Sequence, residues 1–81
     1  MDDPAILKKL EEIIRELFDE YTGPVTPMLS ARDVEQWDSL GHIQFMVMIE
    51  RVFGIRFDLD EVRRLANLGE LVALVRTRTS G

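Results

Sequence analysis

Apolar residues recur every three or four positions near the start of the chain, the pattern of a helix with one buried face. We therefore predict a helix over residues 3–21, with Asp3 as its N-cap and Pro4 at its first helical position. Gly23-Pro24 is expected to stop it. The apolar face consists of Ile6, Leu10, Ile13, Ile14, Leu17, Phe18 and Tyr21.

Residues 22–37 follow no sustained period and are interrupted by glycine and proline, so we expect a long loop here. A short turn is predicted near Ser30 to Asp33. Loops of this length in small domains are uncommon unless they pack well or serve function. The apolar residues expected to hold this loop against the core are Val25, Met28, Leu29, Val34 and Trp37.

The rest of the chain predicts three further helices, over residues 39–53, 58–66 and 68–76. Gly54 suits the position just past the end of the first of these. Each has a polar residue placed to act as its N-cap, and the last two carry a glutamate three positions later, as in a capping box. The predicted N-caps are Asp38, Asp58 and Asn67.

Together these elements predict an all-α fold. We expect a small four-helix bundle, with three main helices, a short third helix and a long loop between helices one and two. Residues 1–81 form one domain on this view, and residues 77–81 are expected to be a frayed tail.

The helix over residues 39–53 has more apolar positions than one buried face needs. On a helical wheel with Ser39 at zero, a broad core face covers about 220° to 340°. Leu40, Ile43 and Val47 fall elsewhere, at about 40° to 100°, with i, i+3, i+7 spacing. This second strip lies among polar residues, so it is either covered by a loop, scattered surface apolarity or a partner contact. The core face holds His42, Phe45, Met46, Ile49, Val52 and Phe53.

Composition narrows the classes of function. The chain has 15 acidic and 10 basic residues, a net charge of −5, which argues against a nucleic-acid partner. It has no cysteine, which excludes disulfides, zinc–thiolate sites and a cysteine nucleophile. No apolar run reaches membrane-spanning length, and the N-terminus has no signal-peptide run, so we expect a cytoplasmic protein without membrane insertion. We also expect a monomer.

Ser39 opens the helix that carries the extra strip. Unpaired backbone N–H groups and the helix dipole favour an anion at that place, so a phosphoryl ester on Ser39 would be well accommodated. The same residues also fit a simpler role, in which Asp38 and Ser39 only cap the helix. The residues alone leave both interpretations open.

The order of motifs resembles the acyl carrier protein family over nearly the whole chain. Asp38-Ser39-Leu40 opens a helix that ends in Glu50-Arg51-Val52-Phe53-Gly54-Ile55, and a short helix and Leu68-Gly69-Glu70-Leu71-Val72 follow. The tripeptide alone is a weak signal, whereas the tripeptide with this helix and downstream pattern is specific.

The resemblance implies a non-catalytic carrier. Ser39, flanked by Asp38 and Leu40, would bear 4'-phosphopantetheine, installed from coenzyme A by a phosphopantetheinyl transferase. The thiol of this arm would hold acyl intermediates as thioesters and present them to acyl-loading and acyl-processing enzymes. The surface that these enzymes recognise would comprise Asp38, Leu40, Ile43, Gln44, Val47, Glu50 and Arg51.

Three positions depart from the acidic pattern of fatty-acid carriers. Gly41, Gln44 and Arg51 stand where acidic residues are frequent in that group. Enzymes that find a carrier by its acidic helix would be attracted less strongly. We therefore expect a carrier of polyketide-type or hybrid secondary metabolism.

Four alternatives stay open at this point. A fatty-acid carrier and a peptidyl or aminoacyl carrier share the serine and the arm. A cofactor-free interaction module would explain the fold and the strip. A hydrolase would use Ser39, His42 and an acid such as Asp38 or Asp58. The residues name neither the group carried nor the pathway, nor whether an acyl chain enters a cavity near Met46.

Overall fold

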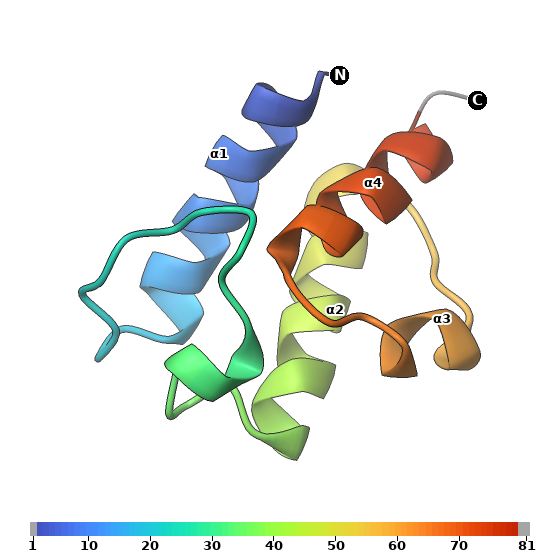
Figure 1. Ribbon diagram of the computed structural model, residues 1–81. Coiled ribbons are helices and arrows are strands. Elements are labelled where there is room, and N and C mark those ends of the chain that lie inside the picture. Colours follow the sequence, from blue (N-terminus) through green and yellow to red (C-terminus); the bar gives the residue numbers. More distant parts are fainter. Residues whose placement is uncertain (1, 80–81) are drawn as a thin grey trace.

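The computed structural model describes residues 2–79 and contains four α-helices and one 3₁₀ turn, with no strand in that range (Figure 1). The all-α class and the order of long helix, long loop, helix, short helix and helix are confirmed. The elements are α1 (Asp3–Leu17), η1 (Ala31–Asp33), α2 (Ser39–Phe53), α3 (Leu59–Arg63) and α4 (Leu68–Thr79).

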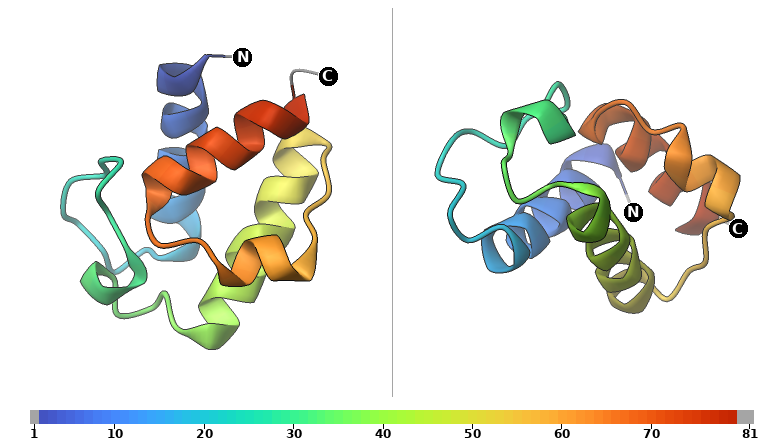
Figure 2. Two further views of the ribbon diagram at one scale, coloured as in Figure 1. Left: turned by 45° about the vertical axis from the view of Figure 1, so that its right-hand side comes forward. Right: turned by 90° about the horizontal axis from the view of Figure 1, so that it is seen from below.

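Helices α1, α2 and α4 surround one core, and α3 lies at the side of the molecule between α2 and α4 (Figures 1 and 2). The start of α1 and the end of α4 lie at the same end of the molecule (Figure 1). An ion pair of 2.7 Å between Arg76 and Asp3 joins them there. The fully buried core residues include Ile6, Leu10 and Ile14 from α1, Phe45 and Ile49 from α2, and Leu71 and Val75 from α4.

Helix α1 starts at residue 3, as predicted, but its N-cap residue and its C-terminal end differ from the prediction of residues 3–21. Asp2, rather than Asp3, is the N-cap, and its side chain accepts a hydrogen bond of 3.0 Å from the Ala5 N–H. The helix ends at Leu17 because the chain turns after it, where Arg15 donates to the carbonyl oxygens of Tyr21 and Gly23 at 3.0 and 2.7 Å. Phe18 and Tyr21 still pack on the core, so the apolar period continues past the helix.

The long loop packs as predicted, with one exception. Leu29, Val34 and Trp37 are buried, whereas Met28 is exposed and does not hold the loop. The backbone N–H groups of Leu68 and Gly69 donate to the loop carbonyls of Leu29 and Pro27, at 2.9 and 2.8 Å. The predicted turn near Ser30 is confirmed as η1.

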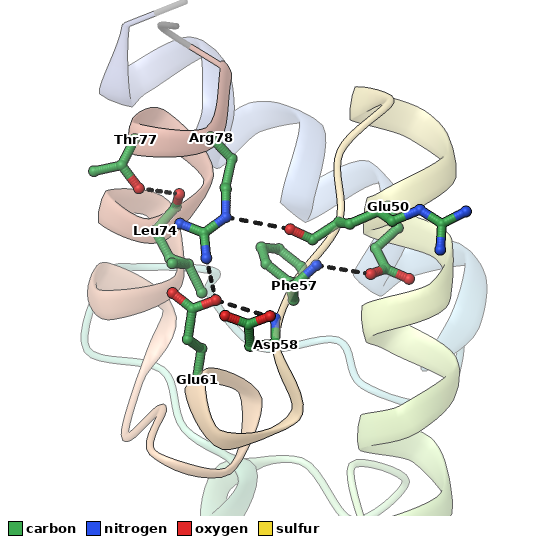
Figure 3. A network of polar contacts seen from close by, with 8 residues as sticks. Glu50, Phe57, Asp58, Glu61, Leu74, Thr77 and Arg78 are labelled. Carbon is green, nitrogen blue, oxygen red and sulfur yellow. Dashed lines mark hydrogen bonds and ion pairs between the residues drawn. The ribbon is translucent and has the colours of Figure 1, made fainter.

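Helices α3 and α4 have other lengths than predicted. The helix expected over residues 58–66 spans Leu59–Arg63, and the one expected over 68–76 runs on to Thr79. Residues 77–79 are therefore helical rather than frayed, and residues 80–81 lie outside the described part. The extension has a physical cause, because Arg78 pairs with Glu61 of α3 and donates to the carbonyl oxygen of Arg56 at 3.2 Å (Figure 3).

The two predicted capping boxes have different outcomes. In α3 the box is present, and the Asp58 N–H donates to Glu61 at 3.0 Å (Figure 3). Before α4 only half of it forms. Asn67 accepts from the Glu70 N–H at 3.0 Å, but the Glu70 carboxylate accepts from the N–H of Ala66 instead of Asn67.

The core face of α2 is narrower than the wheel predicts. Phe45, Met46 and Ile49 are buried, and Phe53 is partly buried against the core. Val52 is 49% exposed, so its assignment to the core is wrong. It lies at the edge of the predicted arc, at about 220°, where the side chain points past the packing partners.

Candidate functional site

The hydroxyl of Ser39 lies on the exposed first turn of α2. Asp38 is the N-cap, as predicted, and its carboxylate accepts a hydrogen bond of 2.8 Å from the Gly41 N–H. The His42 N–H donates to the Asp38 carbonyl oxygen at 2.8 Å. The N–H groups of Ser39 and Leu40 therefore remain at the helix start without an acceptor within the helix.

Gly41 allows the preceding loop to pack directly on the helix. A Cβ atom at this position would lie 2.2 Å from the carbonyl oxygen of Gln36 and 3.1 Å from Phe18. The Gln36 side chain accepts from the Glu20 N–H at 2.9 Å and donates to Asp19 at 3.2 Å. These contacts fix the loop that leads into Ser39, and they leave no space for an acidic side chain at position 41.

Trp37 and His42 pack against each other on the other side of the start of α2. The rings stack with centroids 6.2 Å apart, and the Trp37 indole N–H donates to Nδ1 of His42 at 2.9 Å. Since an indole only donates, Nδ1 accepts, and Nε2 carries the proton that it donates to the Val62 carbonyl oxygen at 3.0 Å. His42 thus links α2 to α3.

This geometry excludes the hydrolase alternative. Both ring nitrogens of His42 are engaged, so neither is available as a base for Ser39. The carboxylate of Asp38 is committed to capping α2, and Asp58 belongs to the capping box of α3. The histidine and the two acids proposed for catalysis serve the local fold instead.

A groove of about 710 Å³ runs beside Ser39, between α2, α3 and the loop. Its walls are mostly apolar, with one charged side chain from α3, Arg63. Ser39 is itself one of the residues that line the groove. Met46 is not part of the lining and fills the core. The groove is lined by Ala31, Trp37, Asp38, Ser39, His42, Ile43, Leu59, Val62, Arg63 and Leu65.

The second apolar strip of α2 is open to solvent. Leu40, Ile43 and Val47 are 64%, 59% and 42% exposed, so no loop covers them. Gln44 and Arg51 are exposed as well. Five of the residues predicted for partner recognition therefore share one accessible surface, which we call the docking strip: Leu40, Ile43, Gln44, Val47 and Arg51.

Glu50 behaves differently from the rest of the predicted recognition set. It is half-buried, and its carboxylate accepts a hydrogen bond of 2.9 Å from the Phe57 N–H (Figure 3). This hydrogen bond holds the segment after α2 and directs the carboxylate toward it.

Sequence reasoning missed the three groove residues that α3 contributes, Leu59, Val62 and Arg63. They come from α3, whereas Ser39 and Ile43 come from α2, so no spacing along one helix relates them. The Trp37–His42 pair was also missed. In the sequence, this pair is indicated only by an indole donor and an imidazole acceptor that lie five positions apart across the start of α2.

Similarity to known proteins identifies the family of the chain. Residues 8–75 match the family model described as a phosphopantetheine attachment site. The acyl carrier protein of Acidothermus cellulolyticus is 36% identical over 74 residues, 91% of this chain and 88% of that protein. That of Rubrobacter xylanophilus is 29% identical over 75 residues, 93% of each chain.

A solved structure shows the same fold. The solution NMR structure of the holo acyl carrier protein from Geobacter metallireducens superposes with a TM-score of 0.81 at 38% identity, covering 90% of this chain and 84% of that one. No helix within residues 2–79 is long and apolar enough to cross a bilayer. The resemblance noted from the sequence is confirmed, and with it the non-catalytic role and the covalent cofactor: the chain belongs to the acyl carrier protein family, whose members carry phosphopantetheine.

Proposed function

We propose that Ser39 is the residue to which 4'-phosphopantetheine is attached. The observation that carries this proposal is an exposed serine on the first turn of α2, which is also one of the residues that line a groove. Ser39 lies inside the segment that matches the attachment-site family. When bound, the arm supplies a thiol that holds acyl groups as thioesters, and the chain has no cysteine of its own.

The chain's own residues hold and present the arm. The free N–H groups of Ser39 and Leu40 favour the negative charge of a phosphodiester at the helix start. Asp38 keeps this turn helical by capping it. The apolar side chains of Ile43, Leu59 and Val62 offer a surface along which an arm or a short acyl group can lie out of water.

Intact mass measures the attachment directly. The protein is incubated with coenzyme A and a broad-specificity phosphopantetheinyl transferase. The parent should gain the mass of one phosphopantetheine, and so should Ser30→Ala, which removes a serine elsewhere. Ser39→Ala should gain none. A modified Ser39→Ala protein, or an unmodified parent with several transferases, would contradict the proposal.

The docking strip, together with Asp38 and Glu50, forms the proposed recognition surface for the transferase and the acyl-processing enzymes. Three exposed apolar side chains at helical spacing support this role, because helices commonly present such anchors to a partner. The residues concerned are Asp38, Leu40, Ile43, Gln44, Val47, Glu50 and Arg51.

For the pathway, we propose polyketide-type secondary metabolism. Gln44 and Arg51 are exposed where fatty-acid carriers often have acids, and Glu50 is partly committed to the Phe57 N–H. Efficient malonyl transfer and elongation by enzymes of fatty-acid synthesis would contradict this. Loading by an adenylating enzyme, rather than by an acyltransferase, would instead identify a peptidyl or aminoacyl carrier.

The cofactor-free interaction module loses its basis, because the chain matches a phosphopantetheine attachment family. We propose that the protein acts as a monomer in the cytoplasm. Sedimentation of the purified protein tests the first point, and fractionation of the source cells tests the second.

A further inference from the structure

An open groove of about 400 Å³ lies at the C-terminal end of α2, away from Ser39. This groove adjoins the docking strip, because Val47 and Arg51 belong to both the groove and the strip. A partner that packs on the strip would therefore extend over the groove as well. The lining residues are Val47, Glu50, Arg51, Gly54, Ile55 and Arg56.

Two arginines provide the positive charge of this groove. Arg51 and Arg56 are both exposed, and neither forms an ion pair within residues 2–79. The carbonyl oxygen of Arg56 accepts a hydrogen bond of 3.2 Å from Arg78, which fixes its backbone and leaves its guanidinium exposed.

The single carboxylate that lines the groove, that of Glu50, already accepts a hydrogen bond from the backbone. Glu50 accepts from the Phe57 N–H at 2.9 Å and is half-buried, so it is held toward the segment after α2. Two exposed guanidinium groups therefore stand against one half-buried carboxylate, and the groove is positive on balance. Guanidinium groups bind carboxylates through paired hydrogen bonds, with both geometry and charge contributing to the preference.

We propose that this groove receives an Asp or Glu side chain of the enzymes that dock on α2, and that it selects enzymes with an acidic docking surface. The inference rests on the proposed function, because it takes α2 as the surface that enzymes recognise. Lysine or arginine side chains of a partner would meet like charge here, which disfavours enzymes that bind carriers through a basic surface.

The charge distribution along the chain supports this selection. Residues 1–37 contain nine acidic and four basic residues, whereas residues 38–81 contain six of each. The whole net charge of −5 therefore belongs to the part before α2. The part that carries Ser39 and the docking strip is balanced, so it offers a basic partner no excess of acidic groups.

A charge reversal tests the proposal. The phosphopantetheine-bearing parent, Arg51→Glu/Arg56→Glu and the control Lys8→Glu/Lys9→Glu are compared as substrates of a malonyl-CoA transacylase whose docking surface is rich in Lys and Arg. Both variants change the charge equally, but Lys8 and Lys9 are exposed on α1. Circular dichroism and thermal melting establish that all three are folded.

We expect the groove variant to raise kcat/KM by about 10-fold over parent and control at low salt, and the gain to shrink at high salt. A transacylase with its docking Lys and Arg replaced by Glu should prefer the parent over the groove variant. Equal rates for groove variant and control, or no preference of the reversed enzyme, would overturn the inference. If the proposed function itself is wrong, the parent accepts no phosphopantetheine, and this result is distinct from the two that overturn the inference.

Discussion

At the scale of single residues, packing explains why position 41 is a glycine, although the sequence suggests an electrostatic reason. Its lack of a side chain suggests, from the sequence, the loss of an acidic contact for partner enzymes. In the structure, the space that a side chain needs is taken by the carbonyl oxygen of Gln36, which belongs to the loop leading into Ser39. The glycine lets that loop approach the helix, and the reduced acidity of the surface results from this packing.

Gly41→Ala is therefore expected to lower the free energy of unfolding by about 1–3 kcal/mol, because the added methyl must displace backbone. Helix propensity alone predicts the opposite sign, a gain of about 1 kcal/mol. Urea unfolding separates the two, with the exposed Gln44→Ala as a control that should change stability by less than about 0.5 kcal/mol. A more stable Gly41→Ala protein would show that the loop yields easily.

At the scale of elements, the position of α3 is held by a hydrogen bond from α2 and an ion pair with α4. Helix α3 spans only Leu59–Arg63 and has no fully buried residue. His42 of α2 bonds to the Val62 carbonyl oxygen, and Arg78 of α4 pairs with Glu61. Because α3 forms one wall of the groove beside Ser39, these links also determine the shape of the proposed arm site.

The pH dependence of stability should reveal one of these links. The N–H of Asp58 and the guanidinium of Arg78 stabilise the carboxylate of Glu61 and hold its pKa below the ordinary 4.5. A lowered pKa in the folded state means that its contribution is complete above pH 4.5 and is lost as the pH falls through the folded value.

Urea unfolding at neutral and acidic pH checks this. Glu61→Gln should be less stable than the parent at neutral pH, and the difference should narrow as the pH falls below 4.5. Asp60→Asn changes a neighbouring exposed acid of α3 and serves as the control, with a smaller dependence. A difference for Glu61→Gln that is the same at both pH values would contradict the link.

The docking strip yields a further prediction for α2. Leu40→Ala and Ile43→Ala should each lower kcat/KM for phosphopantetheine transfer by about 5- to 30-fold, the usual cost of removing an apolar anchor. Stability should hardly change, because both side chains are exposed. Val52→Ala is the matched control, since Val52 is also exposed on α2 but lies off the strip. Equal losses in all three variants would refute a localised docking surface.

The elements that the sequence predicted well are those with local causes. Helix α2 begins and ends as expected, because Asp38 caps one end and Gly54 adopts a left-handed conformation with φ of 67° at the other. The ends of α1 and α4 were missed because Arg15 and Arg78 set them through contacts with other segments. Ser39 could be proposed from its motif, whereas the groove beside it is formed by α2, α3 and the loop before α2, which lie apart in the sequence.

At the scale of the whole molecule, charge and chemistry occupy different parts. The acidic excess lies in residues 1–37, while Ser39, the docking strip and both grooves belong almost entirely to residues 38–81. An excess of one sign opposes association between copies of the chain through net repulsion. It does so without making the docking strip itself acidic, so net charge is a poor guide to the partners of this carrier.

The position of Trp37 has a spectroscopic consequence. It is the only tryptophan of the chain, and it lines the same groove as Ser39. An arm or acyl chain that enters this groove must change the surroundings of a single intrinsic fluorophore. We expect the emission of Trp37 to change between the unmodified, phosphopantetheine-bearing and acylated proteins, and to stay constant when Ser39→Ala is treated in the same way. The carrier would then report its own loading state optically, without an attached dye.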